Sequence, residues 1–394
     1  MGGKRKAGGE AAGGSAPPGP AHTAVRPRGS RAPLGGEVVV GAAKGAKVAC
    51  HRGSVLCLAW SEDGSRLCSG GRDNVAMVWD VGQAGAPPKL VASLGAHKDY
   101  VRGCCWRADG TMLATAGDDK ARLWRTPAEA ERLEREGGGG GEAGKDPHRA
   151  REGGFERVQK LEGHGGRGVK CCAWNADGTL LATGSMDKTA RIWRAGGGAQ
   201  AVEESKVLVG HAAGVECLAW SPDGTMLATA GSDGQIRVWQ VESGECLQTL
   251  GESVSDQPGH LGGVLALAWS PDGGRLASGS LDAAARLWVR EEGGDFALEH
   301  TLDHSTKSGP DEKTWVRALA FRPDGTQLAT ACGDPASDGA VRIWDIDAGG
   351  QAPQVSQSFT HAWSFASVAW SADGDRLAAG TLDSKFKVWS RGAA

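Results

Sequence analysis

The chain has 394 residues, with 44 Lys and Arg against 47 Asp and Glu, and 23% of its residues are charged. No apolar run approaches the roughly 18 residues that a membrane span needs, and the N-terminal region lacks the apolar core of a secretory signal. These properties predict a soluble chain that does not act at a membrane. The 63 Gly indicate many turns, and 15 Trp beside a single Tyr indicate a buried position that recurs along the chain.

Residues 1–36 are rich in Gly, Ala and Pro and are predicted to be a disordered basic tail. This tail holds six of the basic residues and one acid, so 38 basic and 46 acidic residues remain in 37–394. An acidic body argues against general affinity for nucleic acid, which rests on phosphate neutralisation. Lys4-Arg5-Lys6 suits either a nuclear signal or a plain solvated tail. The expected location is therefore cytoplasmic or nuclear.

From residue 60 onward, one pattern recurs seven times. Its first position is aromatic: Trp60, Trp106, Trp174, Trp220, Trp269, Phe321 and Trp370. Asp-Gly begins three residues later in every copy, and Leu follows seven residues after the aromatic anchor. A second Trp closes each copy, at 79, 124, 193, 239, 288, 344 and 389. Self-similarity at a period of about 45 residues predicts a repeat architecture.

Each copy predicts four short strands, as residues 215–250 illustrate. Apolar residues 215–220 precede an S-P-D-G turn, 227–230 precede a second Asp-Gly turn, and 236–239 and 246–250 follow. Asp and Gly supply the backbone conformations that such tight turns require. Four strands in about 45 residues correspond to one blade of a β-propeller.

The pattern resembles the WD-repeat family over roughly residues 37–390. Trp79-Asp80 and Trp344-Asp345 keep the dipeptide that names the family, and Gly-His opens three copies at 163, 210 and 259. The resemblance implies an all-β fold, a seven-bladed β-propeller of four-stranded antiparallel blades within residues 37–394. The segment from Glu37 to Ala49 stands where other copies have their fourth strand, so an N-terminal strand is expected to close the last blade.

The resemblance also implies a structural tetrad in each blade, in which Trp, Ser or Thr, His and Asp are joined by hydrogen bonds. The expected members are His51, Ser69, Asp73 and Trp79 in blade one; His97, Thr115 and Trp124 in blade two; His164, Thr183, Asp187 and Trp193 in blade three; His211, Thr229, Asp233 and Trp239 in blade four; and His260, Ser278, Asp282 and Trp288 in blade five. These residue types also occur in catalytic triads, but the structural interpretation is favoured because a buried indole N–H needs an acceptor.

Three blades depart from this pattern. In blade two either Asp118 or Asp119 completes the tetrad, and in blade six Thr330 and Trp344 are accompanied by Asp334 or Asp338, with His304 well upstream. Ala379 replaces the hydroxyl in blade seven, so that network is expected to be incomplete and Ala379→Ser to be stabilising.

No motif indicates an enzyme. The chain has no H-E-x-x-H, no phosphate loop ending in G-K-[ST] and no C-x-x-C pair, so we expect no catalytic residues, no cofactor, no metal and no small-molecule substrate. Residues 127–156 are predicted to be a flexible insertion in blade two, on the bottom face. Insertions 303–313 and 333–337 are expected on the opposite, top face, where a functional loop and a tolerated surface insertion are the two alternatives for each.

The remaining aromatic residues predict a binding surface. Tyr100, Trp315 and Trp363 fall outside the repeated positions, close to the ends of strands that meet at the top rim. Arg72, Arg102 and Arg317 lie beside the same turns, and aromatic residues with Arg are typical of binding hot spots. The resemblance implies a non-catalytic scaffold that binds proteins or peptides there. Packing of Trp315 and Trp363 beneath the long loops is the alternative for those residues, and a nucleic-acid or chromatin reader, or less plausibly a propeller enzyme, is the alternative function.

Overall fold

The computed structural model describes residues 33–40, 51–82, 86–95, 97–135, 151–196, 201–251, 259–305, 314–333, 338–346 and 352–391. The chain divides into two units, 1–31 and 32–394, and every described residue belongs to the second. Most of the predicted tail therefore lies outside the described residues. Residues 34–36, which that prediction included, belong to the first strand.

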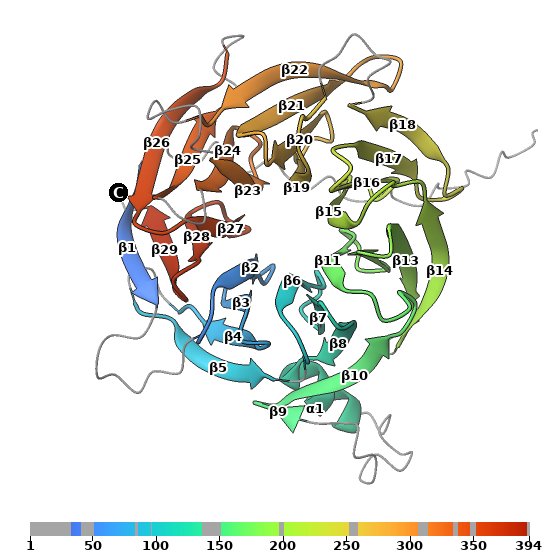
Figure 1. Ribbon diagram of the computed structural model, residues 1–394. Coiled ribbons are helices and arrows are strands. Elements are labelled where there is room, and N and C mark those ends of the chain that lie inside the picture. The colour runs from blue at the N-terminus through green and yellow to red at the C-terminus, as the bar shows by residue number, and fades with distance from the viewer. Residues whose placement is uncertain are drawn as a thin grey trace, which may run out of the picture. The chain divides into compact units, whose positions relative to one another are not determined.

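Seven antiparallel sheets form a closed ring, with the first strand of each repeat innermost (Figure 1). Blade one contains β2 (Val55–Trp60), β3 (Arg66–Gly71), β4 (Ala76–Asp80) and β5 (Lys89–Leu94). Blade two contains β6 (Val101–Trp106), β7 (Met112–Gly117), β8 (Ala121–Arg125) and β10 (Phe155–Leu161), with β9 (Arg151–Glu152) added at its edge. Blade three contains β11 (Val169–Trp174), β12 (Leu180–Ser185), β13 (Thr189–Ala195) and β14 (Val202–Val209).

The other four blades follow the same order. Blade four contains β15 (Val215–Trp220), β16 (Met226–Gly231), β17 (Ile236–Gln240) and β18 (Cys246–Leu250). Blade five contains β19 (Val264–Trp269), β20 (Arg275–Ser280), β21 (Ala284–Arg290) and β22 (Phe296–Asp303). Blade six contains β23 (Trp315–Phe321), β24 (Gln327–Gly333), β25 (Gly339–Asp345) and β26 (Gln354–His361). Blade seven contains β27 (Phe365–Trp370), β28 (Arg376–Thr381) and β29 (Phe386–Arg391), and the predicted seven-bladed propeller is confirmed.

The ring is closed by β1 (Leu34–Val40), which pairs antiparallel with β29 as the fourth strand of blade seven. Val38 lies opposite Val388, and Val39 lies opposite Lys387. Leu34 is buried in the apolar cluster between blades six and seven. The closure predicted from the sequence is therefore confirmed.

The repeated residues have two structural roles: they form a tight turn within each blade and hydrogen bonds between neighbouring blades. Each Asp-Gly turn between the first two strands has its Gly at positive φ, between 66° and 74°, a backbone conformation that costs Gly nothing. The anchor Trp joins neighbouring blades in four copies, where its indole N–H donates to a carbonyl on the innermost strand of the preceding blade: Trp60, Trp106, Trp220 and Trp269. Trp60 donates to Ala369 at 3.1 Å across the closure, and Trp106 donates to Ala59 at 3.2 Å.

The insertion in blade two differs from the flexible loop predicted over 127–156. Residues Pro127–Arg135 form helix α1, which begins with Pro, a residue that suits the first helical position. At the other end β9 pairs with β10, and the Phe155 side chain is fully buried. The burial of this side chain orders the end of the insertion, and residues 136–150 lie outside the described residues. No helix among the described residues is long and apolar enough to cross a membrane.

Candidate protein-binding face

The predicted tetrads in blades one, three, four and five are present in the structure. In blade one the Trp79 indole N–H donates to Ser69 Oγ at 2.8 Å, and Ser69 Oγ lies 2.7 Å from His51 Nε2. His51 Nδ1 lies 2.9 Å from Asp73. The carboxylate can only accept, so Nδ1 carries the hydrogen and Nε2 accepts from the hydroxyl. The corresponding contacts in blades three, four and five measure 2.7–3.1 Å: Thr183, His164, Asp187 and Trp193; Thr229, His211, Asp233 and Trp239; Ser278, His260, Asp282 and Trp288.

In blade two the structure decides between the two candidate carboxylates. His97 Nε2 contacts Thr115 at 2.8 Å and His97 Nδ1 contacts Asp119 at 3.0 Å, while Trp124 donates to Thr115 at 2.9 Å. Asp119 therefore completes this tetrad. Asp118 makes different contacts, described below.

In blade six His304 reaches the network although it lies at the end of β22. Its Nε2 contacts Thr330 at 2.8 Å, and Trp344 donates to the same hydroxyl at 3.0 Å. The Nδ1 donates to the Leu302 carbonyl at 2.9 Å, so a backbone oxygen takes the place of an Asp. Asp338 is exposed, and Asp334 lies outside the described residues.

The pKa values of the tetrad groups follow from burial and hydrogen bonding. Burial lowers the pKa of His97, His164 and His260, and burial, together with the charge of Arg342, lowers that of His304 to about 4. Burial raises the pKa of Asp233, but the hydrogen bond from His211, the charge of that imidazole and two backbone N–H groups together lower it below its ordinary value. These four imidazoles are therefore favoured in the neutral form inside the blades, where their ring nitrogens already have hydrogen-bond partners.

The top rim is the edge that carries the turns between second and third strands and the histidine-bearing turns between blades. Here Tyr100 lies between two guanidinium groups. The Arg72 Cζ is 5.7 Å and the Arg102 Cζ 5.5 Å from the centre of the Tyr100 ring, within cation–π range. Three of the six predicted binding residues are thus brought together where blades one and two meet.

Arg102 also belongs to an ion network that sequence reasoning missed. Its Nε lies 2.7 Å from Asp118, and Lys170 Nζ reaches the same carboxylate at 2.9 Å from blade three. Lys170 follows Val169 as Arg102 follows Val101, so the repeat register held the signal. The network ties blades two and three at the top rim and fixes one of the arginines beside Tyr100.

The other predicted residues lie on blades six and seven. Arg317 Cζ is 4.6 Å from the Trp315 ring centre, and both side chains are half-buried. Trp363 is 50% exposed, so it does not pack beneath a loop among the described residues. Within the described part of the chain, the Trp315 ring packs with Arg317 and not with Trp363. The six residues therefore form two clusters and one separate aromatic residue, on four blades that are consecutive around the ring closure.

Metal-ligand clusters and reactive thiols are two further kinds of site that titratable side chains could form. No group of three or more His, Cys, Asp or Glu among them could hold a metal ion. Burial raises the pKa of the Cys217 and Cys332 thiols, which disfavours the reactive thiolate. None of the nine described cysteines is in a disulfide.

Several known proteins are similar to this chain over part of its length. Telomerase protein component 1 from Rattus norvegicus is 35% identical over 78 residues, which is 20% of this chain and 3% of that protein. Protein HIR1 from Mycosarcoma maydis is 30% identical over 158 residues, 36% of this chain and 13% of that protein. The F-box-like/WD repeat-containing protein TBL1X from Mus musculus is 35% identical over 113 residues, 28% of this chain and 19% of that protein. The chain thus matches a fifth or less of the length of these relatives.

A family model describes the chain far more completely. The WD domain, G-beta repeat model matches residues 45–80, 88–125, 155–194, 203–240, 244–289, 300–345 and 354–390. Each match spans the three inner strands of one blade, and six of the seven also take in all or part of the outer strand of the preceding blade. Together with the closed ring and its tetrads, these matches show that the chain belongs to the WD-repeat family.

Proposed function

We propose that this protein is a non-catalytic scaffold that holds a partner protein at the top rim, as a subunit of a complex. The observation that carries the proposal is the clustering of Arg72, Tyr100 and Arg102, an aromatic ring between two guanidinium groups on a rigid scaffold. Aromatic and Arg side chains supply much of the binding energy at protein interfaces. The name of one partial relative, a component of telomerase, is consistent with a subunit of this kind.

Charge indicates what the partner presents. Arg52, Arg72, Lys98 and Arg167 are exposed at the top rim of blades one to three. None of these four makes an ion pair with another described residue. The acidic balance of residues 37–394 makes such a cluster stand out, and it suits a partner surface with Asp or Glu side chains.

The proposal is tested by affinity purification with mass spectrometry from cells that express tagged variants. Arg72→Ala, Tyr100→Ala and Trp315→Ala on the top rim are compared with Leu247→Ala. Leu247 is 53% exposed near the start of the outer strand β18, the end of that strand away from the top rim. We expect the three top-rim variants to lose partners that the Leu247 variant keeps. Identical partner profiles in all four variants would mean that the top rim does not bind.

The same basic cluster supports nucleic acid as a second candidate ligand, with a nuclear or cytoplasmic location. Fluorescence anisotropy with a 20-base-pair DNA duplex at two salt concentrations separates the candidates. Neutralising phosphate contacts makes affinity fall steeply with salt. Binding that disappears in Arg52→Glu with Lys98→Glu would favour nucleic acid, and absence of binding would leave the protein partner.

A further inference from the structure

Apolar side chains at the start of an outer strand fill the space between blades at several junctions. Val202 begins β14 and packs on Met112 and Leu123 of blade two. Phe296 begins β22 and packs on Met226 and Val238 of blade four. Phe155 and Leu34 begin β10 and β1 in the same way, and all four side chains are at most 5% exposed.

A glutamine on the preceding blade holds three of these strand starts. The Gln159 amide accepts from the Val202 N–H at 2.8 Å and donates to the Val202 carbonyl at 2.9 Å. Gln248 makes the same pair of bonds with Phe296, at 2.7 and 3.0 Å. Gln357 makes them with Leu34, at 3.0 and 3.2 Å. The amide therefore recognises an extended backbone whose side chain is apolar.

The junction between blades three and four lacks both the glutamine and the apolar residue at the start of the outer strand. Lys206 lies opposite Ile192, as Gln159 lies opposite Leu123, so Lys replaces the Gln. The outer strand of blade four begins only at Cys246, because a tight turn joins it to β17: the Gly244 N–H donates to the Gln240 carbonyl at 2.8 Å. Val241, two residues after Trp239, packs in the cluster that includes Ile192 and Leu180. Among the described residues, no side chain at the start of an outer strand covers this cluster as Val202 and Phe296 do elsewhere.

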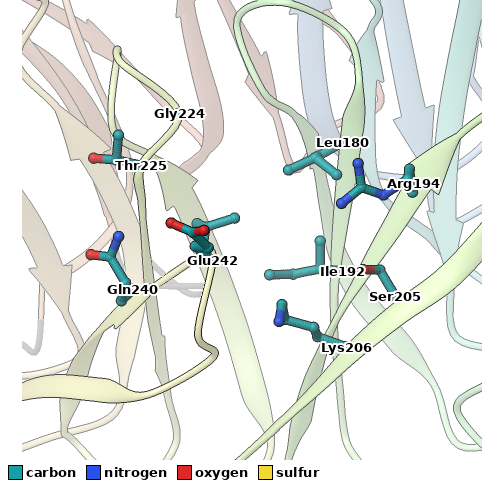
Figure 2. Close-up of a pocket in the computed structure, with 10 residues that line it drawn as sticks. Leu180, Ile192, Arg194, Ser205, Lys206, Gly224, Thr225, Gln240 and Glu242 are labelled. Carbon is teal, nitrogen blue, oxygen red and sulfur yellow. The ribbon is translucent and has the colours of Figure 1, made fainter.

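A groove of about 370 Å³ occupies this place (Figure 2). Leu180, Ile192, Arg194 and Lys206 line it from blade three, and Thr225 and Glu242 line it from blade four. Leu180 is half-buried, whereas the corresponding Met112 is fully buried beneath Val202. The apolar wall is thus left partly uncovered.

The charges of the groove restrict its ligand further. Arg194 and Glu242 are exposed and Lys206 is half-buried. None of the three makes an ion pair within the described part of the chain, while the corresponding Arg125 of blade two pairs with Glu156 at 2.6 Å. Two cations against one acid favour a ligand with a carboxylate next to its apolar group.

We propose that this groove binds an extended peptide segment of a partner protein, through an apolar side chain beside an acidic one. The apolar side chain packs on Leu180 and Ile192, as Val202 packs on the corresponding residues of blade two. The acidic side chain pairs with Arg194 and Lys206. The groove opens among the turns after first and third strands, on the edge opposite the top rim, so this inference does not depend on the proposed function. A scaffold with both surfaces would hold two partners at once.

The binding experiment uses a peptide copied from this chain as the probe and the isoleucine methyl groups of the protein as reporters. A synthetic peptide with the sequence of residues 293–299, Gly-Gly-Asp-Phe-Ala-Leu-Glu, carries an acidic residue beside the Phe that fills the junction of blades four and five. The sequence has four isoleucines, Ile192, Ile236, Ile343 and Ile346, so a methyl NMR spectrum of the full chain labelled at Ile has four signals. We expect the Ile192 signal to shift saturably on titration and the other three to stay in place.

Matched variants decide whether the shift reports the groove. Ser205→Trp should fill the groove from an exposed position, and Lys206→Glu should repel the peptide, each weakening binding about tenfold or more. Lys160→Glu reverses an exposed charge on the outer strand of blade two and should leave the affinity unchanged. The same peptide with Ser in place of Phe should not bind. The proposal is overturned by the absence of a saturable shift up to about 1 mM peptide, a Kd range of weak encounters. A shift of Ile236 instead of Ile192, or one that Ser205→Trp does not affect, overturns it as well.

Discussion

The Trp389 indole N–H donates to a carboxylate oxygen of Glu37 at 3.2 Å, although 352 residues separate the two in the chain. In the other six blades the second Trp donates to a Ser or Thr hydroxyl: Trp79, Trp124, Trp193, Trp239, Trp288 and Trp344. Ala379 offers no hydroxyl in blade seven, so the closing strand supplies the acceptor. Glu37 also pairs with Lys387 at 2.8 Å.

We expect Glu37→Ala to lower the free energy of unfolding by roughly 1–3 kcal/mol, because it leaves a buried indole N–H without an acceptor. Ala379→Ser should restore an acceptor. Because Glu37 already accepts from Trp389, the stabilisation expected from the sequence should be small in the natural protein and appear mainly in the Glu37→Ala protein. Urea denaturation of the two single variants and the double variant measures this coupling. Glu62→Ala, at an exposed turn position, is the control. Equal stabilisation by Ala379→Ser in both backgrounds would contradict the Glu37 contact.

Thr229→Val tests the tetrads. Thr229 accepts from Trp239 at 2.7 Å and lies 2.8 Å from His211 Nε2, so the variant leaves two buried polar groups without their partner. We expect a loss of roughly 2–5 kcal/mol in the free energy of unfolding. Thr301→Val, at an exposed position of β22, should change it by less than about 0.5 kcal/mol. Similar losses in both variants would show that the hydroxyl of the tetrad contributes nothing special.

The free energy of unfolding should decrease as the pH decreases, and His304 should account for part of that loss. Its pKa is about 4 in the folded state and about 6.5 when unfolded, so the unfolded chain binds the proton first as the pH decreases. This contribution is absent above the unfolded pKa and destabilises the fold as the pH falls from about 6.5 toward 4. Between pH 7 and pH 5 it amounts to about 2 kcal/mol. His304→Leu should be less stable at pH 7 and yet lose about 2 kcal/mol less over this interval. Parallel pH profiles of the variant and the natural protein would contradict this.

Thiol labelling should follow burial. Cys246 is exposed on β18, whereas burial raises the pKa of the Cys217 and Cys332 thiols. Iodoacetamide under native conditions should therefore modify Cys246 well before those two, as peptide mass spectrometry would record. Cys246→Ser should abolish this fast reaction, and equally fast labelling of Cys217 would show that blade four opens readily.

The fold could be predicted because every repeat carries its own signals, and seven copies of the Asp-Gly turn and two Trp positions leave little choice. The tetrads in blades one, three, four and five followed from the same register. The acceptor for Trp389 could not be predicted, because it comes from a strand paired only through ring closure. The Asp118 contacts depend on the distance between two blades, which no local pattern encodes. His304 was found only as a distant candidate because blade six lengthens the chain around it.

For the top-rim residues too, the sequence predicted which side chains are involved, while their contacts depend on the fold. Tyr100 and its neighbours were chosen because the repeat does not require them, and the structure brings Arg72, Tyr100 and Arg102 into contact. The groove between blades three and four was not predicted, since Lys206 and the short turn before Cys246 are unremarkable in isolation. They become informative only when the equivalent positions of seven blades are compared in space.

The pairing of β1 with β29 has a consequence for synthesis. The strand that completes blade seven leaves the ribosome before the other six blades, and its partner β29 leaves it only after them. At about 5–20 residues per second, the nascent chain spends roughly 20–70 s with β1 waiting for β29. During that time the strand exposes unpaired backbone amides to other chains, so a chaperone that shields the N-terminal segment should raise the yield of folded protein.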